Sequence, residues 1–162
     1  MRVWVDASTL IALDRIGGLG LLRRLLTKVA VTEEVAEEVF TGKESQELRT
    51  ARGTWIEVVR IHGNRARWTA LGLGPGEASL LLTPRDETVI LDDRAARLAA
   101  LAEGRTVVGL LGLLLRAARE GELPRDEARD LLRKLARSGF HVSGALLGAA
   151  EEELETARRR GN

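Results

Sequence analysis

Three aspartates follow apolar runs in this sequence, at places where a fold could gather them for chemistry. Asp6 ends the run Val3–Val5, and Asp92 and Asp93 come directly after a second run, Val89–Leu91. In sheets of parallel strands, ligands bind beyond the carboxyl ends of the strands, so acids placed there can meet. Two adjacent carboxylates repel each other unless a cation or hydrogen bonds compensate. Asp6 and Asp93 could each simply cap the helix that follows. The sequence leaves open whether Asp92 or Asp93 serves a site.

Glutamates add two further candidates. Glu77 has Leu80 and Leu81 three and four residues later, so it shares their apolar face in the first turn of a helix. A carboxylate on such a face needs a partner or a metal, and the helix N-terminus helps it to stay ionised. The helix expected after Thr32 carries four glutamates, most of them on a solvated face, and spacing alone does not select Glu38 among them.

Carboxylates brought together from separate parts of one sheet would hold a hard divalent cation. Mg²⁺ and Mn²⁺ prefer oxygen ligands and keep coordination sites for water and phosphate. Such an ion can lower the pKa of a bound water and neutralise charge on a phosphodiester. The acidic residues therefore indicate a Mg²⁺ or Mn²⁺ site that acts on phosphate esters.

Short β-branched runs alternate with helical patterns along the first two thirds of the chain, which predicts a three-layer α/β/α fold with a mostly parallel sheet of four or five strands. Strands are expected at Val3–Val5, Val29–Val31, Ile56–Ile61, Val89–Leu91 and Thr106–Val108. Helices are expected over residues 9–26 with a break at Gly17 and Gly18, and over residues 32–40, 76–82 and 94–103.

The last third of the sequence is helical in pattern throughout. Helices are expected over residues 110–120, 124–138 and 143–160, with glycines at 121 and 139 as breaks. Pro124 is well placed to start the second of them. We therefore expect a domain over residues 1–143 and a C-terminal helical tail over residues 144–162.

Composition narrows the classes of protein further. The chain has 162 residues and no cysteine, which excludes disulfides, thiolate zinc sites and cysteine nucleophiles. The formal net charge is only +1, so RNA binding has to come from local patches. The N-terminus enters an apolar run without a secretion signal, and the longest apolar stretch, residues 106–118, is too short to cross a bilayer. These features predict a cytoplasmic protein without a membrane partner.

Five segments in this order resemble PIN-domain proteins, in particular the prokaryotic branch related to the ribonucleases of toxin–antitoxin pairs. They are VDASTLIAL at residues 5–13, VAEEV at 35–39, GPGEAS at 74–79, VILDDRAAR at 89–97 and VGLLGLLLRA at 108–117. The resemblance implies a PIN-like parallel sheet between helices and a metal-dependent endoribonuclease that leaves 5′-phosphate and 3′-hydroxyl ends. It also implies RNA as the substrate, a possible protein antitoxin as a partner and, by family analogy, a homodimer.

The resemblance also assigns residues. The catalytic acids it implies are Asp6, Glu38, Glu77 and the doublet Asp92 and Asp93, of which one member is expected to act. Ser8 is implied as a supporting hydroxyl. The implied metal ligands are Asp6, Glu77, Asp92 and Asp93. Arg94 and Arg97 follow the doublet and could meet substrate phosphate, or could equally be solvated helix residues. Leu91 and Leu110 depart from the family pattern, because a hydroxyl residue is common at both positions.

Two other functions compete with the nuclease. A non-catalytic module on the same fold, binding nucleic acid or an antitoxin, is favoured by the missing hydroxyls at Leu91 and Leu110. A phospho-receiver domain also places aspartates at strand ends. However, its paired acids follow the first strand and a lysine ends a late one, and this chain has neither feature.

Overall fold

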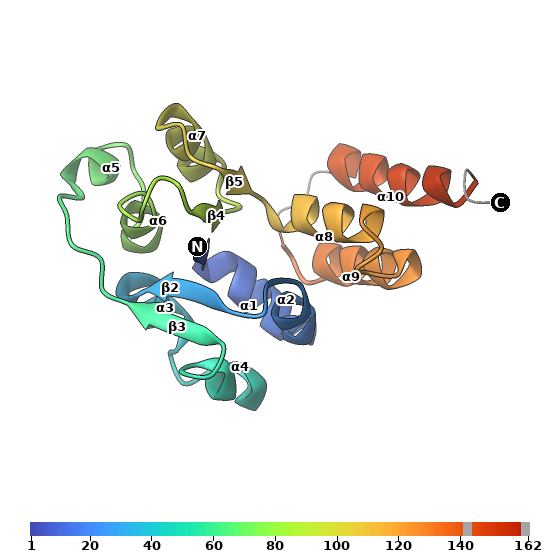
Figure 1. The fold of residues 1–162 in the computed structure, drawn as a ribbon, viewed down its shortest axis with the longest axis horizontal. Helices are drawn as coiled ribbons and strands as arrows, with labels where there is room; N and C mark the ends of the chain where they lie inside the picture. The colour runs from blue at the N-terminus through green and yellow to red at the C-terminus, as the bar shows by residue number, and fades with distance from the viewer. Residues whose placement is uncertain (141–143, 160–162) are drawn as a thin grey trace. The chain divides into compact units, whose positions relative to one another are not determined.

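In the computed structural model of the chain, five short parallel strands form one sheet in the order β3-β2-β1-β4-β5. Figure 1 shows β2 and β3 side by side. The strands are β1 (Val3–Val5), β2 (Val29–Thr32), β3 (Ile56–Val59), β4 (Thr88–Ile90) and β5 (Val107–Val108). In the central strand, Trp4 pairs with Ala30 of β2 and with Val89 of β4. The structure describes the backbone of residues 1–140 and 144–159.

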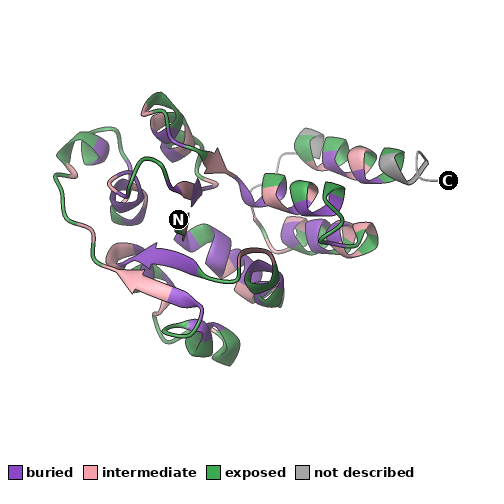
Figure 2. Cartoon of the chain, in the orientation of Figure 1, coloured by how far each residue is buried: buried purple, intermediate pink, exposed green. Residues whose placement is uncertain are grey.

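Burial explains why these apolar runs are strands. The three central strands are covered on both faces: every residue of β2 is buried, as are Trp4 and Val5 of β1 and Val89 and Ile90 of β4 (Figure 2). Parallel strands enclosed in this way carry continuous apolar runs instead of alternating ones. β3 lies at the edge of the sheet and is mostly half-buried.

Seven helices connect these strands. They are α1 (Ala7–Arg15), α2 (Leu19–Leu26), α3 (Glu33–Val39), α4 (Gln46–Ala51), α5 (Ala66–Ala70), α6 (Pro75–Leu80) and α7 (Arg94–Ala102). Four of them begin with a side-chain cap, in which an oxygen of Asp6, Thr32, Ser45 or Asp93 accepts a hydrogen bond from the first turn. The result is the three-layer α/β/α, PIN-like fold that the sequence predicts.

The order of the strands creates a place for a site. The chain leaves β1 towards β2 on one side of the sheet, and it leaves β4 towards β5 on the other side. Because β1 and β4 are neighbours, the chain leaves their ends in opposite directions, which makes a topological switch point between them. In open α/β sheets, ligands bind at such a switch point, outside the carboxyl ends of the strands. Asp6 follows β1 and Asp92 lies just beyond β4, so both aspartates stand at this point.

The helices after β5 belong to the second of two compact units into which the chain divides, residues 1–110 and 111–162. α8 (Leu110–Arg119) leads into the second unit, followed by α9 (Arg125–Arg137) and α10 (Gly144–Arg159). α9 and α10 are tied by an ion pair between Arg133 and Glu151 at 3.5 Å. Ser143 and Arg160, the expected ends of the last helix, lie outside the described residues. The domain boundary expected at residue 143 stays a prediction.

Most expected elements are confirmed, and the differences have physical reasons. The break at Gly17 and Gly18 separates α1 from α2, with Gly17 in a left-handed conformation. α4 and α5 were not expected from the sequence; they are only six and five residues long, and packing of Leu48 and Trp68 buries one side of each. No helix in the described part of the chain is long and apolar enough to span a membrane.

Candidate functional site

Asp6 is the most enclosed acid at the switch point, with a side chain that is 4% exposed. One carboxylate oxygen, Oδ1, accepts from the backbone N–H of Thr9 at 2.9 Å and so caps α1. The other, Oδ2, accepts from the Ser8 hydroxyl at 2.9 Å and from the backbone N–H of Asp92 at 3.0 Å. Asp6 therefore joins the end of β1 to the end of β4 through its own side chain.

Asp92 faces Asp6 from the neighbouring strand. Its Oδ2 accepts from the Thr9 hydroxyl at 2.8 Å, and its Oδ1 accepts from the backbone N–H of Leu110 at 3.1 Å. Burial and the nearby charge of Asp6 raise the pKa of Asp92, while these two hydrogen bonds and the positive charge of Arg97 act in the opposite direction. A carboxylate with a raised pKa beside a second acid is a place where a cation would be stabilised.

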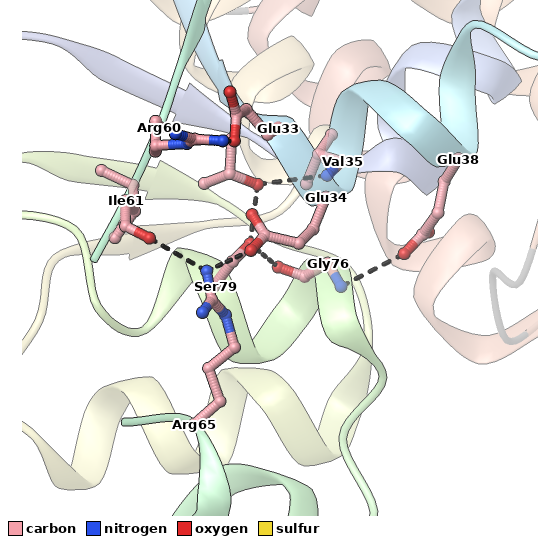
Figure 3. Close-up of polar contacts among 10 residues, drawn as sticks. Glu33, Glu34, Val35, Glu38, Arg60, Ile61, Arg65, Gly76 and Ser79 are labelled. Atoms are coloured by element: carbon pink, nitrogen blue, oxygen red, sulfur yellow. Dashed lines mark hydrogen bonds and ion pairs between the residues drawn. The ribbon is translucent and has the colours of Figure 1, made fainter. Parts of the chain in front are cut away.

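Glu38 approaches the site from α3. Its Oε1 accepts from the backbone N–H of Gly76 at 3.2 Å, at the start of α6 (Figure 3). A Cβ on residue 76 would lie 2.6 Å from this oxygen, so the carboxylate occupies space that only a glycine leaves free. Glu38 is exposed, but desolvation by the neighbouring helix and the charge of Glu77 raise its pKa, and Asp6 adds to this effect. The pKa of Glu38 therefore depends on the charges of two other candidate acids, Glu77 and Asp6.

A buried hydroxyl pair fixes α3 against α6, the helices that carry Glu38 and Glu77. Thr32 Oγ1 and Ser79 Oγ lie 2.6 Å apart, and both residues are fully buried. Ser79 also donates to the carbonyl oxygen of Gly76 at 2.7 Å, while Thr32 caps α3 (Figure 3). These contacts set the separation of the two glutamates before any ligand binds.

Ion pairs with two arginines further fix the position of α3. Arg65, just before α5, pairs with Glu34 of α3 and donates to the carbonyl oxygen of Ile61 at 3.0 Å (Figure 3). Glu33 of the same helix pairs with Arg60 at 2.9 Å. Two of the four glutamates of α3 are thus used in ion pairs, and Glu38 is the one that faces α6.

Glu77 is half-buried in the first turn of α6, which begins at Pro75 after the cap residue Gly74. Its Oε2 would lie 2.7 Å from a Cβ on residue 74, so this carboxylate also folds back over a glycine. The sequence pattern had placed Glu77 on the apolar face of the helix. In the structure the residue is half-buried, between a core position and a fully exposed one.

The other predicted residues are placed differently. Asp93 is exposed and caps α7 by accepting from the N–H of Ala96 at 2.8 Å. Arg94 is exposed as well. Arg97 is half-buried and donates to the carbonyl oxygen of Leu91 at 3.1 Å. Of the aspartate doublet, Asp92 turns towards Asp6 and Asp93 turns to the helix that follows.

The charges of Asp6 and Glu77 act on the other two acids, Glu38 and Asp92. Glu77 raises the pKa of Glu38, and Asp6 raises the pKa values of both Glu38 and Asp92. Within residues 1–140 and 144–159, no three acidic or histidine side chains are grouped tightly enough to enclose a metal ion. Mg²⁺ does not need such an enclosure, because one or two carboxylates and several waters commonly bind it. The oxygen-only donors therefore fit Mg²⁺ or Mn²⁺ in an open site.

Sequence reasoning missed two parts of this site. Thr9 supplies the hydroxyl to Asp92, and the backbone N–H of Leu110 supplies a second donor, so the carboxylate is supported although residues 91 and 110 are leucines. The Gly76 N–H that holds Glu38 was missed as well. The only signal for Thr9 is its position one turn after Asp6, which places both side chains at the start of α1.

The comparison with protein families agrees with this geometry. A family model described as a PIN domain matches residues 2–156. The chain belongs to the PIN-domain family. Neither the curated proteins nor the solved structures contain a match to this chain. PIN domains are generally nucleases that use divalent metal ions, and the fold described above is of this nuclease type.

Proposed function

We propose that this PIN domain is a divalent-metal-dependent endoribonuclease, with Asp6, Glu38, Glu77 and Asp92 as its acidic residues. The observation that carries the proposal is the convergence of Asp6 and Asp92 at the β1–β4 switch point, with Glu38 coupled to Asp6 by charge. Hydrogen bonds from Ser8, Thr9 and backbone N–H groups hold these two carboxylates in place, and a bound cation would in addition offset the repulsion between their charges.

Asp6 and Asp92 would hold the ion, because each follows a strand end and the charge of Asp6 raises the pKa of Asp92. Glu38 and Glu77 would bind it directly or through water from the opposite side. When bound, Mg²⁺ or Mn²⁺ supplies a water of lowered pKa and charge neutralisation for the phosphodiester. Asp93 caps α7 in the structure, which favours Asp92 as the functional member of the doublet.

The chain's own residues prepare the reaction by holding the acids in position. Thr9 orients two carboxylates at once, since its N–H donates to Asp6 and its hydroxyl donates to Asp92. The Ser8 hydroxyl donates to the other carboxylate oxygen of Asp6, Oδ2. In the reaction, a water oxygen bonds to phosphorus, the bond from phosphorus to the 3′ oxygen breaks, and the departing oxygen takes a proton. The acids are the groups available to accept the proton of the attacking water.

Cleavage of labelled RNA with Mg²⁺ or Mn²⁺ tests the proposal. We expect the purified protein to produce fragments with 5′-phosphate and 3′-hydroxyl ends, and we expect Asp92→Asn to cleave at least 100-fold more slowly, since acid-ligand and electrostatic contributions reach this size. Asp86→Asn is the matched control, because Asp86 is an exposed acid two residues before β4. Equal cleavage by the wild-type protein and Asp92→Asn would remove the proposal.

A non-catalytic binding module is the alternative on the same fold. The leucines at 91 and 110 favour it, but Thr9 and the Leu110 N–H supply the donors that a hydroxyl at those positions would have given. A protein that binds RNA without metal and never cleaves it would establish this alternative. The antitoxin partner and the homodimer belong to the family analogy, and co-purification and size-exclusion chromatography test them.

A further inference from the structure

The sequence suggests Arg97 as a contact for substrate phosphate. In the structure, its guanidinium instead donates to the protein's own backbone. Arg97 is on the second turn of α7, half-buried, and its Nη1 donates to the carbonyl oxygen of Leu91 at 3.1 Å. Leu91 directly precedes Asp92 and is fully buried. The guanidinium is therefore committed to the backbone at the end of β4, while its neighbour Arg94 is exposed.

Gly109 provides the space for this guanidinium. A Cβ on residue 109 would lie 2.4 Å from Arg97 Nη1 and 3.0 Å from Asp92 Oδ1. The guanidinium and the carboxylate thus both border the space beside the backbone of residue 109, with no direct hydrogen bond between them, and the positive charge of Arg97 acts on Asp92 across this space. Gly109 does not have a left-handed backbone conformation, so an alanine there would be accepted by the backbone and would have to displace the guanidinium.

We propose that Arg97 is the positioning residue and fixed counter-charge of Asp92, and that Gly109 is a glycine because the Arg97 guanidinium fills the space beside it. This inference rests on the proposed function, in which Asp92 binds the metal. Groups that hold metal ligands from behind typically change metal affinity or activity by about 10–100-fold when they are removed. The proposal takes Arg97 out of the RNA-binding surface.

Steady-state cleavage kinetics separate the two roles of Arg97. We expect Arg97→Gln to lower kcat by about 10-fold or more with an unchanged KM for RNA, and we expect Arg97→Lys to recover part of the loss because it keeps the charge. Gly109→Ala, which displaces the guanidinium, should lower kcat similarly and should add little to Arg97→Gln. Arg49→Gln, an exposed substitution on α4, is the control.

A contact with RNA phosphate would give a different result. In that case Arg97→Gln would raise KM and would reduce the slope of log affinity against log salt concentration by about one. That outcome, or a kcat equal to that of the wild type, would overturn the inference.

A thermal double-mutant cycle keeps the inference testable if the wild-type protein cleaves no RNA, a result that would remove the proposed function alone. We expect Arg97→Gln to lower the unfolding midpoint by roughly 2–4 °C in the wild-type background and by less in Asp92→Asn, where only the hydrogen bond to Leu91 is lost. Equal shifts in both backgrounds would show that Arg97 does not act through Asp92.

Discussion

Asp6 and Asp92 differ in how many donors depend on their carboxylates, and this difference predicts that substitution by asparagine costs more stability at Asp6 than at Asp92. Asp6 accepts from the N–H of Thr9, the N–H of Asp92 and the hydroxyl of Ser8. Asparagine offers a single acceptor oxygen and an NH₂ group that only donates. The Ser8 hydroxyl can rotate to accept from the new NH₂, but one of the two backbone N–H groups then faces another donor. Leaving a buried donor unpaired costs about 1–3 kcal/mol.

Asp92→Asn leaves no backbone N–H without a partner, and the exchange falls on the Thr9 hydroxyl, which can rotate. Its amide oxygen can accept from the N–H of Leu110, and its NH₂ can donate to the Thr9 hydroxyl, which is able to accept. Both substitutions remove the repulsion between Asp6 and Asp92, so the difference between the variants isolates the hydrogen bonds. We therefore expect Asp92→Asn to be at least as stable as the wild type, and Asp6→Asn to be less stable than Asp92→Asn.

Thermal unfolding in EDTA at neutral pH measures this difference. All three tryptophans lie within residues 1–110, so their fluorescence reports the unit that contains the site. A loss of about 1–3 kcal/mol corresponds to a midpoint lower by roughly 2–10 °C for a chain of this size. Asp86→Asn serves as the control for loss of an exposed negative charge. A midpoint for Asp6→Asn equal to or above that of Asp92→Asn would refute this account of the hydrogen bonds.

Four further outcomes follow from the structure. Gly76→Ala places a Cβ 2.6 Å from Glu38 Oε1 and should slow RNA cleavage by about 10-fold without lowering the unfolding midpoint, because the flexible carboxylate moves and alanine favours the helix. Thr9→Val removes the hydroxyl from Asp92 and should lower kcat by about 10-fold, whereas Thr9→Ser should retain the activity. Arg105→Leu should destabilise the fold by about 3 kcal/mol in urea unfolding, because the buried guanidinium donates to three carbonyl oxygens. Because the pKa of Asp92 is raised, its ionisation opposes folding at neutral pH. The stability advantage of Asp92→Asn in EDTA should therefore shrink as the pH falls through the raised pKa and should vanish below the ordinary value of 3.8.

Each of these expectations has an outcome that contradicts it. Unchanged cleavage by Gly76→Ala would show that the position of Glu38 does not matter, and inactive Thr9→Ser would show that Thr9 acts through its methyl group. A neutral Arg105→Leu would mean that the three carbonyls find other donors. An advantage of Asp92→Asn that grows on acidification would reverse the sign of the pKa shift.

The sequence was sufficient to predict the sheet and those candidate acids that lie directly after its strands. Continuous apolar runs mark the buried strands, and Asp6 and the aspartate doublet follow two of these runs, which the structure brings next to each other. The doublet itself stayed ambiguous, because both residues are adjacent in sequence. The distinction arises from the chain direction after β4, where Asp93 caps α7 and Asp92 accepts from Leu110.

Contacts across long sequence separations explain what the residues alone could not reveal. Glu38 meets the N–H of Gly76 across 38 positions, and Thr9 meets Asp92 across 83 positions. Neither pairing leaves a local pattern, so Glu38 emerged only from the family resemblance and Thr9 was missed. α5 is a similar case, because Arg65 and the buried Trp68 hold it through contacts that spacing within five residues cannot predict.

Calorimetric titration with Mn²⁺ tests the convergence of the acids most directly, because it requires neither an RNA substrate nor turnover. We expect the wild-type protein to bind Mn²⁺, and we expect Asp92→Asn to bind at least 10-fold more weakly while remaining folded. Absence of binding by the wild type at millimolar Mn²⁺, or equal affinity of the two proteins, would contradict a metal site built on Asp6 and Asp92.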